Sequence, residues 1–140
     1  MYFIFINSAG DYESSKPSYS LNEVMNNAKT ISYDDLFRYN DQYVGTAVQY
    51  EGEIIQVGGS SGNYYFRIDV TKNVNSWGTD YEDTVYVTYS GDDRFLEGDI
   101  VKFYGVVQGI KSYTSVIGAE IEVPEIHALS IELIEKAGER

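Results

Sequence analysis

Apolar and polar residues alternate with a period of two in several stretches of this 140-residue chain. Successive side chains of a β-strand point to opposite faces, so this alternation predicts strands with one buried face. The clearest stretch spans residues 64–71, and its inward set is Tyr64, Phe66, Ile68 and Val70. Further stretches with strand character are residues 46–57, 85–89, 99–108, 119–123 and 126–134. The pattern therefore predicts a mainly-β fold.

The same alternation predicts which side chains form the core. They are expected to be Ile54, Phe66, Ile68, Val85, Val87, Val101, Phe103 and Ile121. Segments without alternation are predicted to be connections, namely residues 58–63, 72–82, 90–97 and 109–116. Pro124 is expected to end a strand, because proline has no N–H for a sheet ladder.

Two of the strand-like stretches contain an internal glycine. Gly52 interrupts residues 48–54, and Gly105 lies near the end of residues 98–106. A glycine among β-branched and aromatic residues is typical of a bulge or a tight bend. A small closed barrel needs such bends at its corners, so the glycines favour a barrel over a flat sheet.

Two short helices are predicted before the strands. Ser20 and Glu23 have the spacing of a capping box, which predicts a helix start there and an end near Lys29. Ser32, with Asp35 three positions later, predicts a second start and a helix to about Tyr39.

The start of the chain differs in composition from the rest. Residues 1–19 are predicted to be an apolar start and a flexible polar arm, and residues 20–140 to be the barrel domain. Met1–Ile6 is apolar but far too short to span a bilayer, so it is interpreted as an added strand or an arm for self-association. The location is expected to be cytoplasmic if the chain is complete, and extracellular if an export signal has been removed.

Residues 96–105 carry the most specific sequence signal. They begin around Gly98-Asp99, continue as a hydrophobic strand and end at Gly105. This run resembles the signature that opens strand four of many OB-type domains, including tRNA-anticodon-binding-like families. Residues 33–45 also resemble the start of small OB-like domains of bacterial lipoproteins and phage-borne proteins. The resemblance implies a five- to six-stranded Greek-key barrel with one or two short N-terminal helices.

The resemblance also implies where a ligand binds. OB-type barrels bind oligonucleotides or oligosaccharides across strands two and three, between the loops that join strands one to two and four to five. The candidate ligand-binding residues at those places are Tyr65, Arg67, Tyr86, Trp77 and Tyr113. Aromatic rings stack on bases or sugars, and an arginine binds a phosphate or a carboxylate. The alternative interpretation is that these tyrosines only form cross-strand pairs that stabilise the sheet.

The charge of the chain argues against direct nucleic-acid binding. The formal net charge is −12, and the ten basic residues form no cluster in the sequence. Phosphate binding depends on such clusters. The acids gather in two short stretches, which define a candidate acidic partner surface: Asp80, Glu82, Asp83, Asp92, Asp93, Glu97 and Asp99. The alternative interpretation is a solvated rim that keeps the protein soluble.

Residues for catalysis or metal binding are scarce. The sequence has no cysteine and one histidine, His127, which is interpreted as structural. Asp92-Asp93 lacks the ligand loop of a calcium site. We therefore expect no enzyme, no metal and no cofactor.

Two functions remain open from the sequence. One is a non-catalytic OB-like module that binds a polymer ligand or a protein through its aromatic face. The alternative is an acidic, phage-type inhibitor that mimics nucleic acid and occupies the basic cleft of a nucleic-acid-handling protein. A continuous acidic stripe would favour mimicry, whereas scattered acids around an uncharged aromatic groove would favour ligand binding.

Overall fold

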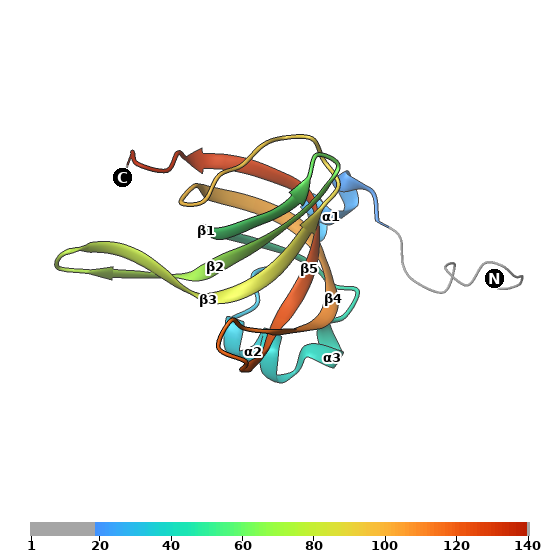
Figure 1. Cartoon of the computed structure of the whole chain (residues 1–140). Coiled ribbons are helices and arrows are strands. Elements are labelled where there is room, and N and C mark those ends of the chain that lie inside the picture. The colour runs from blue at the N-terminus through green and yellow to red at the C-terminus, as the bar shows by residue number, and fades with distance from the viewer. Residues whose placement is uncertain (1–18, 140) are drawn as a thin grey trace, which may run out of the picture.

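β-Strands make up most of the chain that the computed structural model describes, residues 19–139. The strands in this range are β1 (Ala47–Ser60), β2 (Asn63–Asn75), β3 (Gly78–Tyr89), β4 (Ile100–Thr114) and β5 (Glu120–Glu135). Short helices precede them: α1 (Leu21–Asn27), α2 (Tyr33–Arg38) and α3 (Asn40–Tyr43) (Figure 1). The predicted apolar start and most of the polar arm lie outside the described residues.

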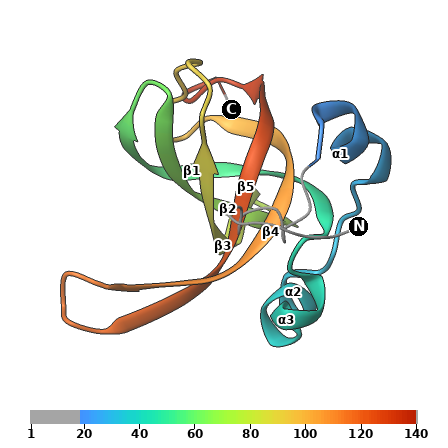
Figure 2. The same cartoon turned by 90° about the vertical axis from the view of Figure 1, so that its right-hand side faces the viewer.

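The strands form a closed barrel in the order β1-β2-β3-β5-β4. Neighbours are antiparallel except β3 and β5, which run parallel and pair only from Tyr86–Tyr89 to residues 125–128. Figure 2 shows the barrel from the side, with α2 and α3 below α1 along one flank. The predicted mainly-β barrel with short N-terminal helices is confirmed.

The two internal glycines lie where backbones come unusually close. β1 pairs with β4 up to Glu53 and with β2 from Glu53 onward, so Gly52 lies beside the switch. A Cβ on Gly52 would be 2.2 Å from the carbonyl oxygen of Asp69. One on Gly105 would be 2.3 Å from the carbonyl oxygen of His127, and the β4–β5 register shifts at this glycine. The expected irregularities are therefore present, and only glycine fits them.

Most of the predicted core is confirmed. The side chains of Ile54, Phe66, Ile68, Val85, Val87, Val101 and Phe103 are almost completely buried. The helix-bearing segment adds Ile31 and Leu36 to this core, and α2 lies at the lower end of the barrel in Figure 1. The prediction for Ile121 was wrong, because this residue is half-buried on a part of β5 that extends past the barrel, while Val123 is buried.

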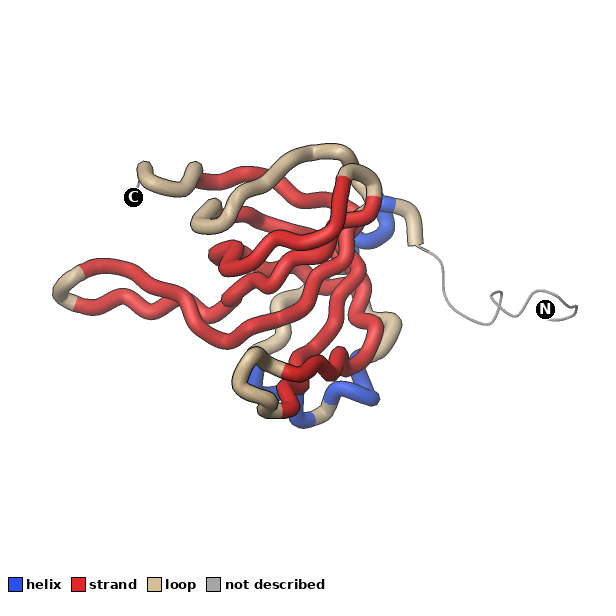
Figure 3. The backbone as a smooth tube through the Cα atoms, in the orientation of Figure 1, coloured by secondary structure: helices blue, strands red, loops and turns tan. Residues whose placement is uncertain are grey.

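Two predicted connections are strands instead. Residues 72–82 form the outer part of a hairpin, the β2–β3 arm, which turns between Asn75 and Gly78. Most of residues 109–116 belong to β4 and form a second hairpin with β5, the β4–β5 arm. Both arms extend away from the barrel, the β2–β3 arm as seen in Figure 3 and the β4–β5 arm as seen in Figure 2. Neither arm therefore has a continuously apolar face, and the alternation is lost.

Pro124 does not end a strand as predicted. β5 continues through it from Glu120 to Glu135, so the described residues contain no sixth strand. Pairing of β5 with β3 begins only at the next residue, Glu125. Proline is tolerated in a strand where no neighbour needs its N–H.

The helix starts follow the predicted capping signals. Ser20 and Glu23 form a complete capping box at α1, and the side chain of Ser32 accepts from the Asp35 N–H at α2. The hydroxyl of Tyr19 donates to the carbonyl of Gly45, so the described chain contacts the barrel before α1 begins. No helix in residues 19–139 has the length and apolar character needed to cross a membrane.

The first testable prediction concerns the core. Phe103 is fully buried, so Phe103→Ala should lower the free energy of unfolding by about 3–5 kcal/mol. Phe37→Ala is the matched control, because Phe37 is 38% exposed and should cost clearly less. Urea denaturation measures both, and equal effects of the two substitutions would contradict this packing.

Candidate functional site

Side chains from β2, β3 and the β4–β5 arm meet on the outer surface of the barrel. The rings of Tyr65 and Tyr86 are stacked, with centroids 5.4 Å apart and an interplanar angle of 13°. Arg67 lies directly opposite Tyr86 in the β2–β3 register. We call this surface the tyrosine face and define it by Tyr65, Arg67, Tyr86, Lys111 and Tyr113.

Two cations hold the tyrosine face together. The Arg67 guanidinium carbon lies 5.3 Å from the centroid of the Tyr113 ring, and Lys111 Nζ lies 5.0 Å from that of Tyr86. Arg67 Nη1 also donates to Gln56 Oε1 at 2.7 Å. Because cation–π contacts and this hydrogen bond act together, the side chains are ordered before any ligand arrives.

The contacts of Tyr65 and Tyr86 leave little open ring surface. A Cβ on Gly58 would be 2.0 Å from Tyr65 Cζ, so the Tyr65 ring lies directly over the Gly58 backbone. Tyr65 therefore contacts Gly58 and Tyr86, while Tyr86 contacts Tyr65 and Lys111. Much of the surface of these two rings is therefore used for contacts within the protein.

Sequence reasoning missed Lys111 and Gln56. The signal for Lys111 was its position two residues before Tyr113, which in a strand places both on one face. That segment was interpreted as a loop, so the periodicity was not applied. Gln56 follows the shift in the β1–β2 register after Ile54, which alternation alone does not predict.

An open cleft of about 680 Å³ adjoins Arg67 and Tyr113. It lies where β3 and β5 separate, between the two arms. Its walls also include Tyr33 of α2, Asp83 and Thr84 of β3, and Ile121 and Glu122 of β5. The barrel surface thus continues from the tyrosine face into a hollow.

The cleft has an acidic character. Asp69 accepts a hydrogen bond from Thr84 Oγ1 at 2.5 Å, and burial raises the pKa of the Asp69 carboxyl. Burial, with the charges of Asp83 and Asp69, raises the pKa of Tyr33 to about 12. Among the described residues that line the cleft, Arg67 supplies the positive charge. The environment therefore suits a neutral or cationic group better than a phosphate.

Trp77 is far from the other predicted ligand residues. It lies in the tip of the β2–β3 arm and is 85% exposed. Its backbone N–H donates to Asn75 Oδ1. Gly78 and Tyr86 are eight residue steps apart along β3, a length of about 25 Å. The structure brings together Tyr65, Arg67, Tyr86 and Tyr113, but not Trp77.

The predicted acids fall into two separate groups. Asp80, Glu82 and Asp83 lie on the β2–β3 arm, and Asp83 faces the cleft with a left-handed φ of 71°. Asp92, Asp93 and Glu97 lie on the connector between β3 and β4. The connector is beside the β1–β2 turn, where Ser61 Oγ donates to Asp92. The six residue steps along β3 from Asp83 to Tyr89 separate the groups by about 20 Å.

Asp99 does not belong to an exposed acidic surface, contrary to the sequence-based expectation. It is only 5% exposed. Its two carboxylate oxygens accept from the N–H groups of Leu96 and Ala137, at 2.8 and 2.9 Å. Hydrogen bonds to a buried carboxylate stabilise the fold, so Asp99 has a structural role.

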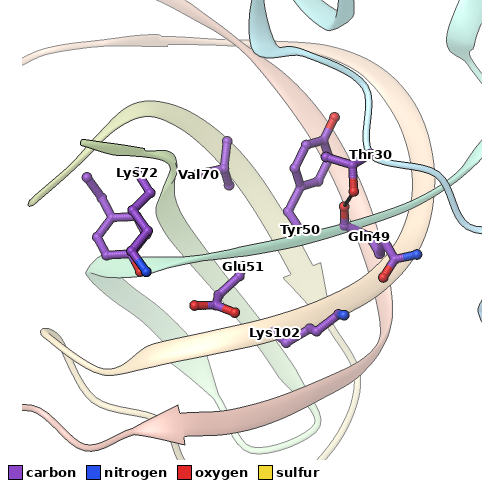
Figure 4. Close-up of a pocket in the computed structure, with 8 residues that line it drawn as sticks. Thr30, Gln49, Tyr50, Glu51, Val70, Lys72 and Lys102 are labelled. Atoms are coloured by element: carbon purple, nitrogen blue, oxygen red, sulfur yellow. Dashed lines mark hydrogen bonds between the residues drawn. The ribbon is translucent and has the colours of Figure 1, made fainter. Parts of the chain in front are cut away.

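A second depression, of about 370 Å³, lies beside β1 and the base of the β2–β3 arm. Figure 4 shows Lys72, Lys102 and Glu51 among its lining residues. Thr30 Oγ1 donates to the Gln49 carbonyl at its edge. Charges of both signs share the depression, so it lacks the single-signed character of an anion site.

His127 is hydrogen-bonded to a residue of the neighbouring strand. His127 Nδ1 lies 2.8 Å from Thr88 Oγ1, and the two residues are opposite each other in the β3–β5 pair. Within residues 19–139, no three His, Cys, Asp or Glu side chains are grouped as metal ligands. The arrangement of His127 is that of a cross-strand pair.

Comparisons with known proteins identify the fold. No protein-family model and no curated protein sequence matches the chain. Aspartyl-tRNA synthetase from Entamoeba histolytica matches 88% of this chain with a TM-score of 0.55 and 13% identity, and the chain spans 24% of that protein's length. An OBody bound to hen egg-white lysozyme matches 78% of this chain and 98% of its own, with a TM-score of 0.50 and 16% identity. With the closed barrel, these matches show that the chain has an OB-fold, as the resemblance implied.

The second prediction tests the stack on the tyrosine face. Gly58→Ala would force the Tyr65 ring away from its present position, because the new Cβ would overlap it. The ring-current shifts that Tyr65 and Tyr86 exert on each other should then fall in proton NMR spectra, while the fold is retained. Gly91→Ala is the matched control, because its Cβ would displace a different ring, that of Tyr89, whose Cζ lies 2.3 Å away, and it should leave the Tyr65 and Tyr86 signals unchanged. Unchanged Tyr65 and Tyr86 signals in Gly58→Ala would rule out this packing.

The third prediction concerns Asp69 and pH. A carboxyl whose pKa is raised by folding contributes stability that is complete below its ordinary pKa and is lost as the pH rises through the raised value. Asp69→Asn keeps an oxygen acceptor for Thr84 and cannot ionise. Its stability relative to the wild type should therefore increase from about pH 4 to about pH 7. Urea denaturation at both pH values measures this, and a difference that is the same at both would contradict burial of the charge.

Proposed function

We propose that this OB-fold chain is a non-catalytic binding module that engages a polymer ligand or a protein through the tyrosine face and the adjoining cleft. The observation that carries the proposal is the ordered set of side chains from three strands at this place. OB barrels bind their ligands on the surface of strands two and three, beside the loops that join strands one to two and four to five. The tyrosine face occupies that position.

Order within the tyrosine face supports a binding role. Arg67 is held by Gln56 and Tyr113, and Lys111 lies against Tyr86. Side chains that are already fixed lose little conformational entropy when a partner binds. Tyrosine and arginine are also the residue types that most often dominate protein interfaces.

A protein partner is favoured over single-stranded nucleic acid. Bases stack on open aromatic faces, whereas Tyr65 and Tyr86 contact each other, Gly58 and Lys111. Phosphates require several cations, whereas the cleft beside the face holds Asp83 and Glu122. The OBody with a similar fold is bound to a protein, lysozyme, which is support by analogy only.

The alternative, mimicry of nucleic acid, has less support. Mimicry needs carboxylates in a continuous row, but the two acid groups lie about 20 Å apart along β3. Asp99 is buried and used by the fold. The acidic groups therefore enter the test below as the competing explanation.

The fourth prediction distinguishes these functions. The wild-type chain and two variants are immobilised side by side, and proteins captured from a lysate are quantified after washes of rising salt. The face variant carries Arg67→Ala and Tyr86→Ala, and it should retain about a tenth or less of the captured partner, as expected for central interface residues. The charge variant carries Asp92→Asn, Asp93→Asn and Glu97→Gln, and it should retain most of it.

Thermal unfolding of each variant provides the folding control. Loss of capture only in the charge variant would favour mimicry. Loss in neither variant would reject the tyrosine face as the site. A single-stranded oligonucleotide and a mixed oligosaccharide panel, tested on the same surfaces, decide whether a polymer other than protein is bound.

A further inference from the structure

The outer part of β3 has a sheet neighbour on one side only within the described chain. β3 pairs with β2 from Gly78 to Tyr89 except at Asp83, whose backbone is left-handed, but β5 accompanies β3 only over Tyr86–Tyr89. We call the length of β3 before that point, Thr79, Asp80 and Glu82–Val85, the open edge. A strand edge of this kind offers main-chain N–H and C=O groups to an added strand.

The barrel itself cannot cover the open edge. Continuing the parallel register by one residue would place Val85 opposite Pro124, which has no N–H to donate. β5 instead leaves β3 and pairs with β4 along the β4–β5 arm. The β2–β3 arm projects to the left in Figure 1 and the β4–β5 arm to the lower left in Figure 2, so the two arms diverge.

The space between the arms is the cleft already described. Asp83 and Thr84 of the open edge form one wall, and Glu122 and Val123 of β5 form the opposite wall. A strand that pairs with the open edge would therefore lie along the mouth of this cleft. The open edge spans about 20 Å, enough for a segment of six or seven residues.

Charge determines which segment fits. Asp80, Glu82 and Asp83 lie on the open edge, and Glu120 and Glu122 lie on β5 across the gap. Two copies of this edge would place like charges against one another, which disfavours self-pairing. Lysine or arginine side chains on an added strand would instead meet carboxylates on both sides.

We infer that the open edge binds an extended, lysine- or arginine-bearing segment of a partner protein as an added strand of the sheet. The inference rests on the proposed function in one respect, that the partner is a protein. Main-chain hydrogen bonds supply the affinity, and the acids select for basic side chains. The tyrosine face then contacts another part of the same partner.

The experiment uses the full-length chain and a defined probe, the capped peptide Lys-Val-Lys-Thr-Lys-Val. Binding should perturb the amide signals of Thr79, Asp80 and Glu82–Val85 in heteronuclear NMR spectra. It should also slow the hydrogen exchange of those amides among them that point away from β2. A peptide with glutamate in place of lysine should not bind. A lysine peptide N-methylated at alternate residues should bind at least about tenfold more weakly, because it has lost the donors on one edge.

Matched protein variants test the role of the acids. The edge variant, Asp80→Asn, Glu82→Gln and Asp83→Asn, should bind the lysine peptide about tenfold more weakly. Asparagine also tolerates the left-handed backbone of residue 83, so the arm keeps its shape. The connector variant, Asp92→Asn, Asp93→Asn and Glu97→Gln, removes the same charge and should bind within about twofold of the wild type.

Three outcomes would overturn the inference. The N-methylated peptide binds as well as its parent, the edge and connector variants weaken binding equally, or the open-edge amides that point away from β2 exchange slowly in the free chain. The last result would mean that residues 1–6 or a second copy already cover the edge. The lysine peptide tests the open edge alone, whereas the lysate capture above tests the tyrosine face, so failure at the edge and failure of the tyrosine face are told apart.

Discussion

The fold depends on how closely the backbone of β1 approaches its neighbours at Gly52. β1 pairs with β4 before this residue and with β2 after it. The position of a Cβ there is already filled by the carbonyl oxygen of Asp69. The absence of a side chain lets β1 bend and change partners, and this bend closes the sheet into a barrel.

Closure of the barrel also determines where the candidate site lies. Once β1 has bent toward β2, Gln56 and Gly58 lie beside Arg67 and Tyr65 and support them. On the other flank, β4 is much longer than the barrel wall requires, and its excess length carries Lys111 and Tyr113 to the same surface. The tyrosine face therefore forms where β1 bends toward β2 and where β4 continues beyond the barrel. Neither feature contributes a buried side chain, yet both decide which polar groups meet.

The sequence predicts those strands that have one buried face and one exposed face. Phe66, Val87 and Phe103 alternate with polar residues because one face of each strand is dry, and they were identified correctly. Beyond the barrel, neither face of the two arms is buried. Their strands therefore look like loops in the sequence, and Lys111 and the position of Trp77 were missed for that reason.

Other errors have a different physical origin. Asp99 was grouped with the exposed acids because a carboxylate beside other carboxylates looks like surface, and its two backbone partners come from residues 3 and 38 positions away. Ile121 fits the inward set of its strand, but the barrel ends before it. Local patterns report the character of a side chain, whereas its surroundings depend on how far each strand continues.

The buried carboxylate of Asp99 also ties two distant parts of the chain into one unit. It holds the connector through Leu96 and the segment after β5 through Ala137, and the Cβ of Ala137 lies only 2.9 Å from where a Cβ on Gly98 would be. Neither segment can move without breaking a hydrogen bond to the same charged group. Opening of the connector and fraying of the final strand each cost a hydrogen bond to Asp99, so the two movements are coupled through this residue. A substitution near Ala137 therefore also affects the acidic connector, which lies at the opposite end of the barrel from α2.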